Sequence, residues 1–357
     1  MSEAQQDSVS EPTGSNPGPD PVRTLLPFLV LAGAHLPFGI MHYRSSWSLE
    51  HYQFFPFALG SFGWLIWTRR DPARDCWTWR SHVLLALDIA LLLAGCVLYS
   101  PWLVTCGFAV GLCGLSLAVS EQGFSRSMFF LCYLPLLTVR LPLGRDTELI
   151  SWLQVMTTNL ASGIGHRIGL IHFTEGNAIK VPGRSFLVAE ACSGVNSLFT
   201  IMFIAAFVVA TQRRSVFHGL MLLFSGFVVA GIMNTVRVLS VILVWDIWQF
   251  DIATGWVHDA LGYVVLLIAA GFLLSGDMFF HWLTDKVPDI RRPGIMSIYR
   301  NPLIRLWNRF AAPGSEQKSA SLKPIMLSSR LTLVFGGIGA LAVVGQIVAI
   351  VSGKVSG

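Results

Sequence analysis

Long apolar stretches dominate this sequence and limit the folds that are open to it. An α-helix needs about 20 apolar residues to cross the hydrocarbon core of a bilayer. Stretches near that length occur at residues 24–42, 52–68, 82–99, 101–119, 127–144, 194–211, 216–235, 257–282 and 331–351. Charged residues make up only 13% of the chain, about half their share in a soluble domain. The sequence predicts an all-α polytopic integral membrane protein with about nine spans.

Basic residues between these stretches predict the topology. Residues 284–330 hold nine Lys and Arg against three Asp and Glu, and the other basic loop positions are Arg69, Arg70, Arg74, Arg80, Arg126, Arg213 and Arg214. Cytoplasmic loops carry an excess of Lys and Arg, so we expect these segments and the N-terminus in the cytoplasm. Residues 145–193, Arg237 and His258 then share the outer, periplasmic side of a bacterial inner membrane. The net charge of +5 fits contact with membrane lipids, and we expect no nucleic-acid partner.

The same pattern divides the chain into segments. We expect a disordered cytoplasmic tail (1–22), N-terminal transmembrane helices (23–147), a core (148–283) that holds the candidate functional residues described below, a basic cytoplasmic linker (284–330) and a C-terminal transmembrane helix (331–351). Two segments are atypical spans. Residues 148–170 are amphipathic and are expected to lie in the outer interface. Residues 238–250 are too short to cross and return, so a re-entrant or interfacial helix is predicted there. If they spanned instead, Arg237 and His258 would be separated.

A short extended segment precedes the sixth apolar stretch. Residues 177–181 and 185–189 read as two strands joined by a Pro182-Gly183 turn. They predict a small extracytoplasmic β-hairpin just before Cys192. Of the six cysteines, Cys76 lies in a basic loop, and four fall inside predicted spans (Cys96, Cys106, Cys113 and Cys132). Cys192 alone is expected to face the oxidising side, without a disulfide partner.

Cys192 lies where an apolar helix begins. Unpaired N–H groups and the helix dipole stabilise a thiolate there, and Ser193 or Gly194 can shape the turn. Glu190 shares a strand face with Cys192 and is either a positioning group or a solvated carboxylate. The alternative interpretation is that Cys192 is a small, buried apolar residue with no chemical role. The sequence shows no clustered Cys or His typical of a metal site, and we expect no cofactor.

A cation and an imidazole accompany this thiol on the predicted outer side. Arg237 follows Asn234 by one helical turn, which makes a polar patch rather than a single interfacial anchor. His258 precedes Gly262 by one turn, and a small residue there leaves room for another helix or a substrate. A nucleophile, a base and a guanidinium at the membrane edge indicate thiol-based acyl transfer. Four other outer histidines are alternative bases, namely His42, His51, His166 and His172.

Three stretches together resemble the exosortase/archaeosortase family: Glu190-Ala-Cys192-Ser-Gly194, Asn234-x-x-Arg237-Val238 and His258-x-x-x-Gly262. The approach through Glu175-Gly-Asn177-x-Ile179 to Val188-x-Glu190 is also similar. The resemblance covers residues 24–283. Val195-Asn196 and the added last span depart from the common pattern, so the subtype, the U-type among them, stays open.

This resemblance implies that Cys192, Arg237 and His258 are the catalytic residues of a membrane cysteine peptidase or transpeptidase. It implies membrane-anchored protein substrates with a C-terminal sorting signal: a short motif such as Pro-Glu-Pro, a transmembrane helix and a basic tail. Cleavage near the motif would pass the protein to an unknown acyl acceptor. Two alternatives stay open: a transporter whose Asp88 and Arg237 line a pathway, and a non-catalytic component of extracellular polysaccharide export.

Overall fold

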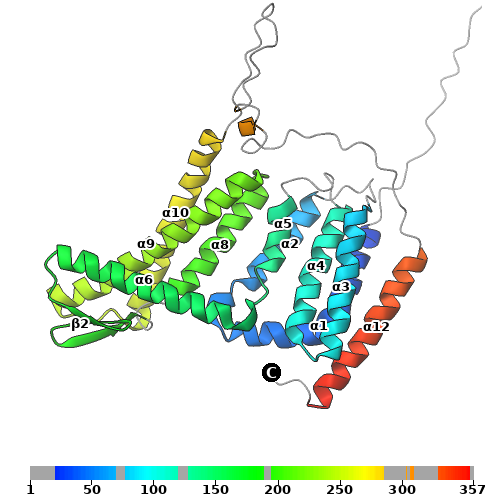
Figure 1. Cartoon of the computed structure of the whole chain (residues 1–357), viewed down its shortest axis with the longest axis horizontal. Helices are drawn as coiled ribbons and strands as arrows, with labels where there is room; N and C mark the ends of the chain where they lie inside the picture. Colours follow the sequence, from blue (N-terminus) through cyan, green and yellow to red (C-terminus); the bar gives the residue numbers. More distant parts are fainter. Residues whose placement is uncertain are drawn as a thin grey trace, which may run out of the picture.

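The computed structural model describes residues 21–69, 77–119, 128–188, 194–284, 303, 306–308 and 329–353. This part of the chain is mostly helical with one small sheet (Figure 1). Five of its helices are long and apolar enough to cross a membrane: α1 (Pro21–Trp47), α3 (Trp79–Val97), α4 (Pro101–Val119), α9 (Val216–Trp248) and α10 (Gly255–Leu283). Further apolar helices are α2 (Phe55–Arg69), α5 (Met128–Leu136), α8 (Gly194–Thr211) and α12 (Ser329–Val351). Nine spans therefore stay a prediction.

α4 is the most enclosed of the five long helices, and α1 and α3 pack directly against it. Its glycines permit this close approach, since a Cβ atom at Gly111 would lie 2.7 Å from Leu31 of α1 and 2.8 Å from the Asp88 carboxylate of α3. The sequence left the partner of Asp88 open. In the structure it is His35 of α1, whose Nε2 lies 3.0 Å from Asp88 Oδ1.

The C-terminal helix α12 docks on α1 beside a proline. Pro37 lies inside α1, where it lacks an N–H group and perturbs the helical hydrogen bonds. The Gln346 amide of α12 lies against the same turn. Its Oε1 accepts from Phe38 N at 3.0 Å, and its Nε2 donates to Ala34 O at 2.9 Å. A buried side chain of α12 therefore satisfies main-chain groups of α1, as the membrane interior requires.

α5 is much shorter than the apolar stretch that predicted it. Residues 127–144 were expected to form one span, but the helix ends at Leu136, one residue after Pro135. The chain then turns through Thr138, whose hydroxyl donates to Pro135 O at 2.7 Å. A 3-10 turn (Pro142–Gly144) leads into the next helix. The proline accounts for the early end, because its ring removes a donor and clashes with the preceding turn.

α9 corrects the prediction for residues 238–250. No re-entrant or separate interfacial helix begins there, because α9 continues unbroken from Val216 to Trp248, 33 residues in all. At 1.5 Å per residue it is about 50 Å long, well beyond the roughly 30 Å of a hydrocarbon core. The excess packs against the sheet through Val238, Leu239, Val241 and Ile242. Residues 238–248 are therefore the last part of α9, and their apolar side chains are buried against the sheet.

The sheet has three antiparallel strands in the order β1 (Phe173–Glu175), β2 (Ala178–Val181) and β3 (Arg184–Leu187). The predicted pairing of the last two is confirmed, with Val181 opposite Arg184 across the Pro182-Gly183 turn. β1 was not predicted, and it makes the hairpin a three-stranded sheet. Inward-facing Ile179, Phe186 and Val188 form a common core with the end of α9.

α6 (Arg145–Arg167) confirms a helix close to residues 148–170. Figure 1 shows it running across the neighbouring helices, near the sheet, rather than alongside them. It packs on α9 and on the first two strands. Trp152, Leu160, Ile164 and Ile168 are exposed and recur at helical spacing, as an interfacial helix requires.

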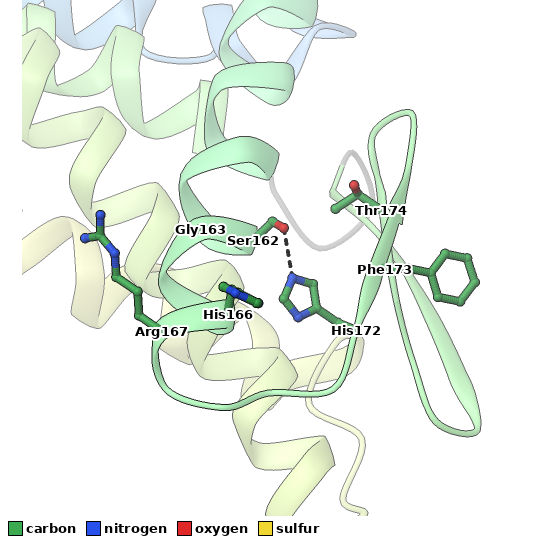
Figure 2. Close-up of a pocket in the computed structure, with 7 residues that line it drawn as sticks. All are labelled: Ser162, Gly163, His166, Arg167, His172, Phe173 and Thr174. Carbon is green, nitrogen blue, oxygen red and sulfur yellow. Dashed lines mark hydrogen bonds between the residues drawn. The ribbon is translucent and has the colours of Figure 1, made fainter.

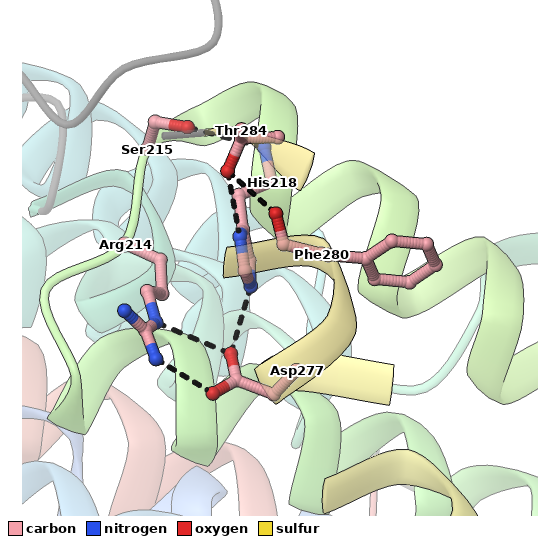
Figure 3. Close-up of polar contacts among 6 residues, drawn as sticks. All are labelled: Arg214, Ser215, His218, Asp277, Phe280 and Thr284. Atoms are coloured by element: carbon pink, nitrogen blue, oxygen red, sulfur yellow. Dashed lines mark hydrogen bonds and ion pairs between the residues drawn. The ribbon is translucent and has the colours of Figure 1, made fainter. Parts of the chain in front are cut away.

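The end of the bundle away from the sheet contains a polar cluster around the buried Asp277 carboxylate (Figure 3). Arg214 donates twice to the Asp277 carboxylate, at 2.8 and 3.2 Å, and His218 Nε2 lies 2.7 Å from Asp277 Oδ1. Thr284 Oγ1 lies 3.4 Å from His218 Nδ1. Nearby, the Arg69 guanidinium donates to Ala210 O at the end of α8. These contacts join the α8–α9 turn to the end of α10.

Asp277→Asn should destabilise the protein. The substitution removes the carboxylate that pairs with partly buried Arg214 and bonds buried His218, and losing hydrogen bonds to such a charged group costs about 1.5–3 kcal/mol. Asp246→Asn is the matched control, because Asp246 is exposed at the end of α9. Thermal unfolding in detergent, followed by tryptophan fluorescence, gives the comparison. Equal melting temperatures for the two variants would contradict a stabilising role for the cluster.

Candidate functional site

The predicted nucleophile lies in the connection between the sheet and α8. Cys192, Glu190 and Ser193 are outside the described residues, as is Cys76. The flanking elements are described. Val188 follows β3 and donates its N–H to Asn177 O at 2.8 Å. Gly194 is the first residue of α8. The predicted context of Cys192, a short strand before it and an apolar helix after it, is therefore present.

Arg237 of α9 and His258 of α10 meet at the sheet end of these helices. Arg237 Nη2 lies 2.7 Å from His258 Nε2 and 3.3 Å from His258 O. Both residues are buried, at 5% and 7% exposure. A guanidinium stays charged and can only donate. Nε2 of His258 is therefore the acceptor, which assigns the ring proton to Nδ1 and makes the imidazole neutral.

Gly262 provides the space for this pair. A Cβ atom at Gly262 would lie 3.0 Å from Arg237 Nη2 and 3.1 Å from Cζ. The sequence predicted that Gly262 would admit another helix or a substrate. In the structure the guanidinium of α9 occupies that space, one helical turn beyond His258.

Asn234 also lies in this region, one turn before Arg237 on α9. Its Nδ2 donates to Thr157 Oγ1 of α6 at 3.0 Å, and both side chains are buried. The two residues of the expected polar patch therefore contact different helices. Asn234 contacts α6, and Arg237 contacts α10. Sequence spacing gave no signal for Thr157, because it lies 77 positions away in the chain.

The loop between α9 and α10 brings His258 back toward Arg237. In this loop Asp251 pairs with Arg184 of β3. Burial would raise the pKa of Asp251, but hydrogen bonds from Ala253 N and Arg184 outweigh it and lower the pKa. Ile252 is buried in the core shared with the sheet. The guanidinium of Arg184 also lies 4.9 Å from the ring centre of Trp245 of α9. One strand therefore holds both the end of α9 and the segment leading to His258.

Two of the four alternative histidines, His51 and His172, contact other groups. His51 lies 3.6 Å from the Asp146 carboxylate, and burial lowers its pKa against the opposing effect of Asp146. His172 bonds Ser162 Oγ through Nε2 at 2.8 Å (Figure 2). Its Nδ1 donates to Leu170 O at 2.9 Å. With His166 it lines an open pocket of about 620 Å³ between α6 and β1. Of the five histidines, His258 is the one that contacts Arg237.

The transporter alternative gains no support from the positions of Asp88 and Arg237. Asp88 packs with α1 and α4, while Arg237 packs with α10 in a different group of helices (Figure 1). The two therefore do not line one pathway in the structure. Among the described residues, no group of three or more His, Cys, Asp or Glu side chains could hold a metal ion.

The fold and these contacts define a helical membrane protein with an arginine–histidine pair at the end where a short sheet meets the bundle. The family model of the transmembrane exosortases matches residues 46–275, well over half of the chain. The chain belongs to this family. No curated protein and no solved structure matches it.

Gly262→Ala should displace the guanidinium of Arg237, because the added methyl group meets it at 3.0 Å. Overpacking at such a contact costs about 1 kcal/mol or more. Gly271→Ala in the same helix is the control, since a Cβ atom added there would have nothing within 4 Å of it. Melting temperatures of the two purified variants decide the point. If Gly262→Ala is as stable as Gly271→Ala, the space at Gly262 is not required by Arg237.

Proposed function

We propose that this protein is a membrane cysteine peptidase or transpeptidase that cleaves C-terminal sorting signals of exported proteins. The observation that carries the proposal is the buried contact between Arg237 and His258 in a chain of the exosortase family. Both residues lie at the end of the bundle where the sheet leads toward Cys192. The substrates would carry a short motif such as Pro-Glu-Pro, a transmembrane helix and a basic tail.

In the proposed reaction the thiolate of Cys192 attacks the carbonyl at the cleavage motif. His258 takes the thiol proton and returns a proton to the leaving amine. Arg237 donates to the developing oxyanion, where fixed donors contribute most. The resulting thioester is resolved by an amine, a hydroxyl group or water. Glu190, Ser193 and Gly194 would shape the approach to the nucleophile.

The contact between Arg237 and His258 links these two roles. Nε2 of His258 accepts from Arg237 only while the imidazole is neutral. Nε2 has a single lone pair, so the guanidinium must move aside as the thiol proton arrives, and the protonated ring can then no longer accept from it. Nη2 of Arg237 then loses this partner as negative charge develops on the substrate oxygen. Proton transfer to the base would thus release the donor for the oxyanion.

The topology fits a substrate that crosses the same membrane. Arg237 lies 21 residues after the start of α9, or about 32 Å at 1.5 Å per residue. That distance is close to one hydrocarbon thickness. With the basic loops inside, the Arg237–His258 pair would lie at the periplasmic surface of the inner membrane. A substrate helix docked beside the bundle would present its motif at that height.

Cys192→Ala should abolish processing while leaving the protein folded, because only a sulfur atom is removed. The measurement is conversion of a full-length substrate to its cleaved form in cells, with Cys106→Ala as the control.

Arg237→Lys keeps the charge but loses the planar, multiply donating group, so it should also be severely impaired. Normal conversion by Cys192→Ala would disprove the nucleophile. Normal conversion by Arg237→Lys would reduce Arg237 to an anchor.

Cys192 should be accessible from outside the cell. Membrane-impermeant maleimide applied to intact cells should label Cys192 and spare Cys76, because the arginine-rich loops are retained in the cytoplasm. Single-cysteine variants that keep one of the two positions make the result unambiguous. Labelling of Cys76 without Cys192 would reverse the proposed topology and remove the site from the periplasmic side.

A further inference from the structure

We infer that Gln154 and Thr157 of α6 are positioning residues for the cysteine–arginine–histidine site. Each bonds an asparagine, and each asparagine fixes a segment that carries a proposed reacting group. The inference rests on the proposed function, and it assigns to α6 a part in the reaction that the sequence motifs do not contain.

Thr157 fixes the arginine side of the site. Its Oγ1 accepts from Asn234 Nδ2 at 3.0 Å, and Thr157 and Asn234 are only 1% and 8% exposed. At this depth water cannot readily replace a lost partner. Asn234 lies one turn before Arg237, on the same side of α9. This bond therefore ties α6 to the turn of α9 from which Arg237 projects toward His258.

Gln154 is linked to the strand segment that precedes Cys192. Its Oε1 accepts from Asn177 Nδ2 at 3.3 Å. The main-chain oxygen of Asn177 in turn accepts from Val188 N at 2.8 Å. Val188 is fully buried and is the last described residue before Glu190 and Cys192. The chain of contacts from Gln154 therefore reaches the point where the nucleophile segment leaves the sheet.

One helix carries both links. Gln154 and Thr157 are three residues apart, so they are neighbours on the surface of α6. α6 is further held on α9, where Met156 lies 3.1 Å from the Cβ position of Gly231 and Trp152 stacks on Phe227 at 6.2 Å. A helix bonded to both branches would hold the segment that leads to Cys192 in a fixed relation to the turn of α9 that carries Arg237. Neither residue needs to touch the substrate to affect the rate.

The chain offers a matched pair of variants to test this. Thr157→Val removes the hydroxyl that accepts from Asn234 Nδ2 and keeps the side-chain shape. Thr158→Val is the control, because Thr158 is equally buried and its hydroxyl donates to Gln154 O of its own helix at 2.8 Å. With purified full-length enzyme and a sorting-signal peptide, kcat of Thr157→Val should fall about tenfold to a hundredfold with KM unchanged, since small misplacements have effects of that size. Thr157→Ser, which keeps the acceptor, should restore the rate.

Two substitutions of Gln154 give an independent test of the inference. They can be used even if the Thr157→Val protein does not accumulate in cells. Gln154→Met loses the acceptor for Asn177, and Gln154→Glu keeps it. The former should reduce kcat and slow alkylation of Cys192 by iodoacetamide, whereas the latter should do neither. Alkylation is informative because a purely structural role would change stability without changing the reactivity of the thiol.

The outcomes are distinguishable. If Cys192→Ala is inactive but Thr157→Val matches Thr158→Val, the positioning role is wrong and the proposed function stands. If Thr157→Val and Thr158→Val lose activity in proportion to a lowered melting temperature, the role is structural and the inference also fails. If Cys192→Ala remains active, the proposed function itself is wrong.

Discussion

The length of α9 is the constraint on which the site depends. A helix of 33 residues exceeds the thickness of a bilayer by about 20 Å, and the part beyond Arg237 must find another surface to cover its apolar face. That surface is the three-stranded sheet. The sheet is then tied to the loop before α10 through Arg184 and Asp251. The part of α9 beyond Arg237 therefore packs on the sheet, and the sheet holds the loop that places His258 next to Arg237.

Polar groups occur at both ends of α9 and α10, and their chemistry differs. Away from the sheet, the Asp277 carboxylate compensates Arg214 and His218. At the sheet end, Arg237 meets an imidazole rather than an acid. A carboxylate would hold a guanidinium permanently, whereas a neutral imidazole releases it on protonation. The first arrangement suits a fixed connection between helices, and the second suits the change of partner that we propose for Arg237.

The sequence predicted features that depend on local chemistry. Pro182 and Gly183 indicated the turn between β2 and β3, and the spacing of Asn234, Arg237, His258 and Gly262 selected residues that the structure brings together. It missed β1, which is only three residues long. The predicted span ended at residue 235, whereas α9 continues to Trp248. A rule based on membrane thickness does not include a sheet that buries the remaining turns of the helix. Thr157, Gln154 and the partner of Asp88 depend on contacts between distant segments, which no single stretch encodes.

The docking of α12 has a consequence for how such chains vary. α12 lies outside the residues that match the family, as does most of α1. Gln346 binds α1 only through the main-chain atoms of Phe38 and Ala34, and main-chain atoms are the same whatever side chains α1 carries. Side-chain changes in α1 therefore leave these two hydrogen bonds in place. They act on α12 through the apolar cluster that Ala34 and Phe38 form with Ala342 and Ala349, so the polar attachment of α12 and its apolar fit can vary independently.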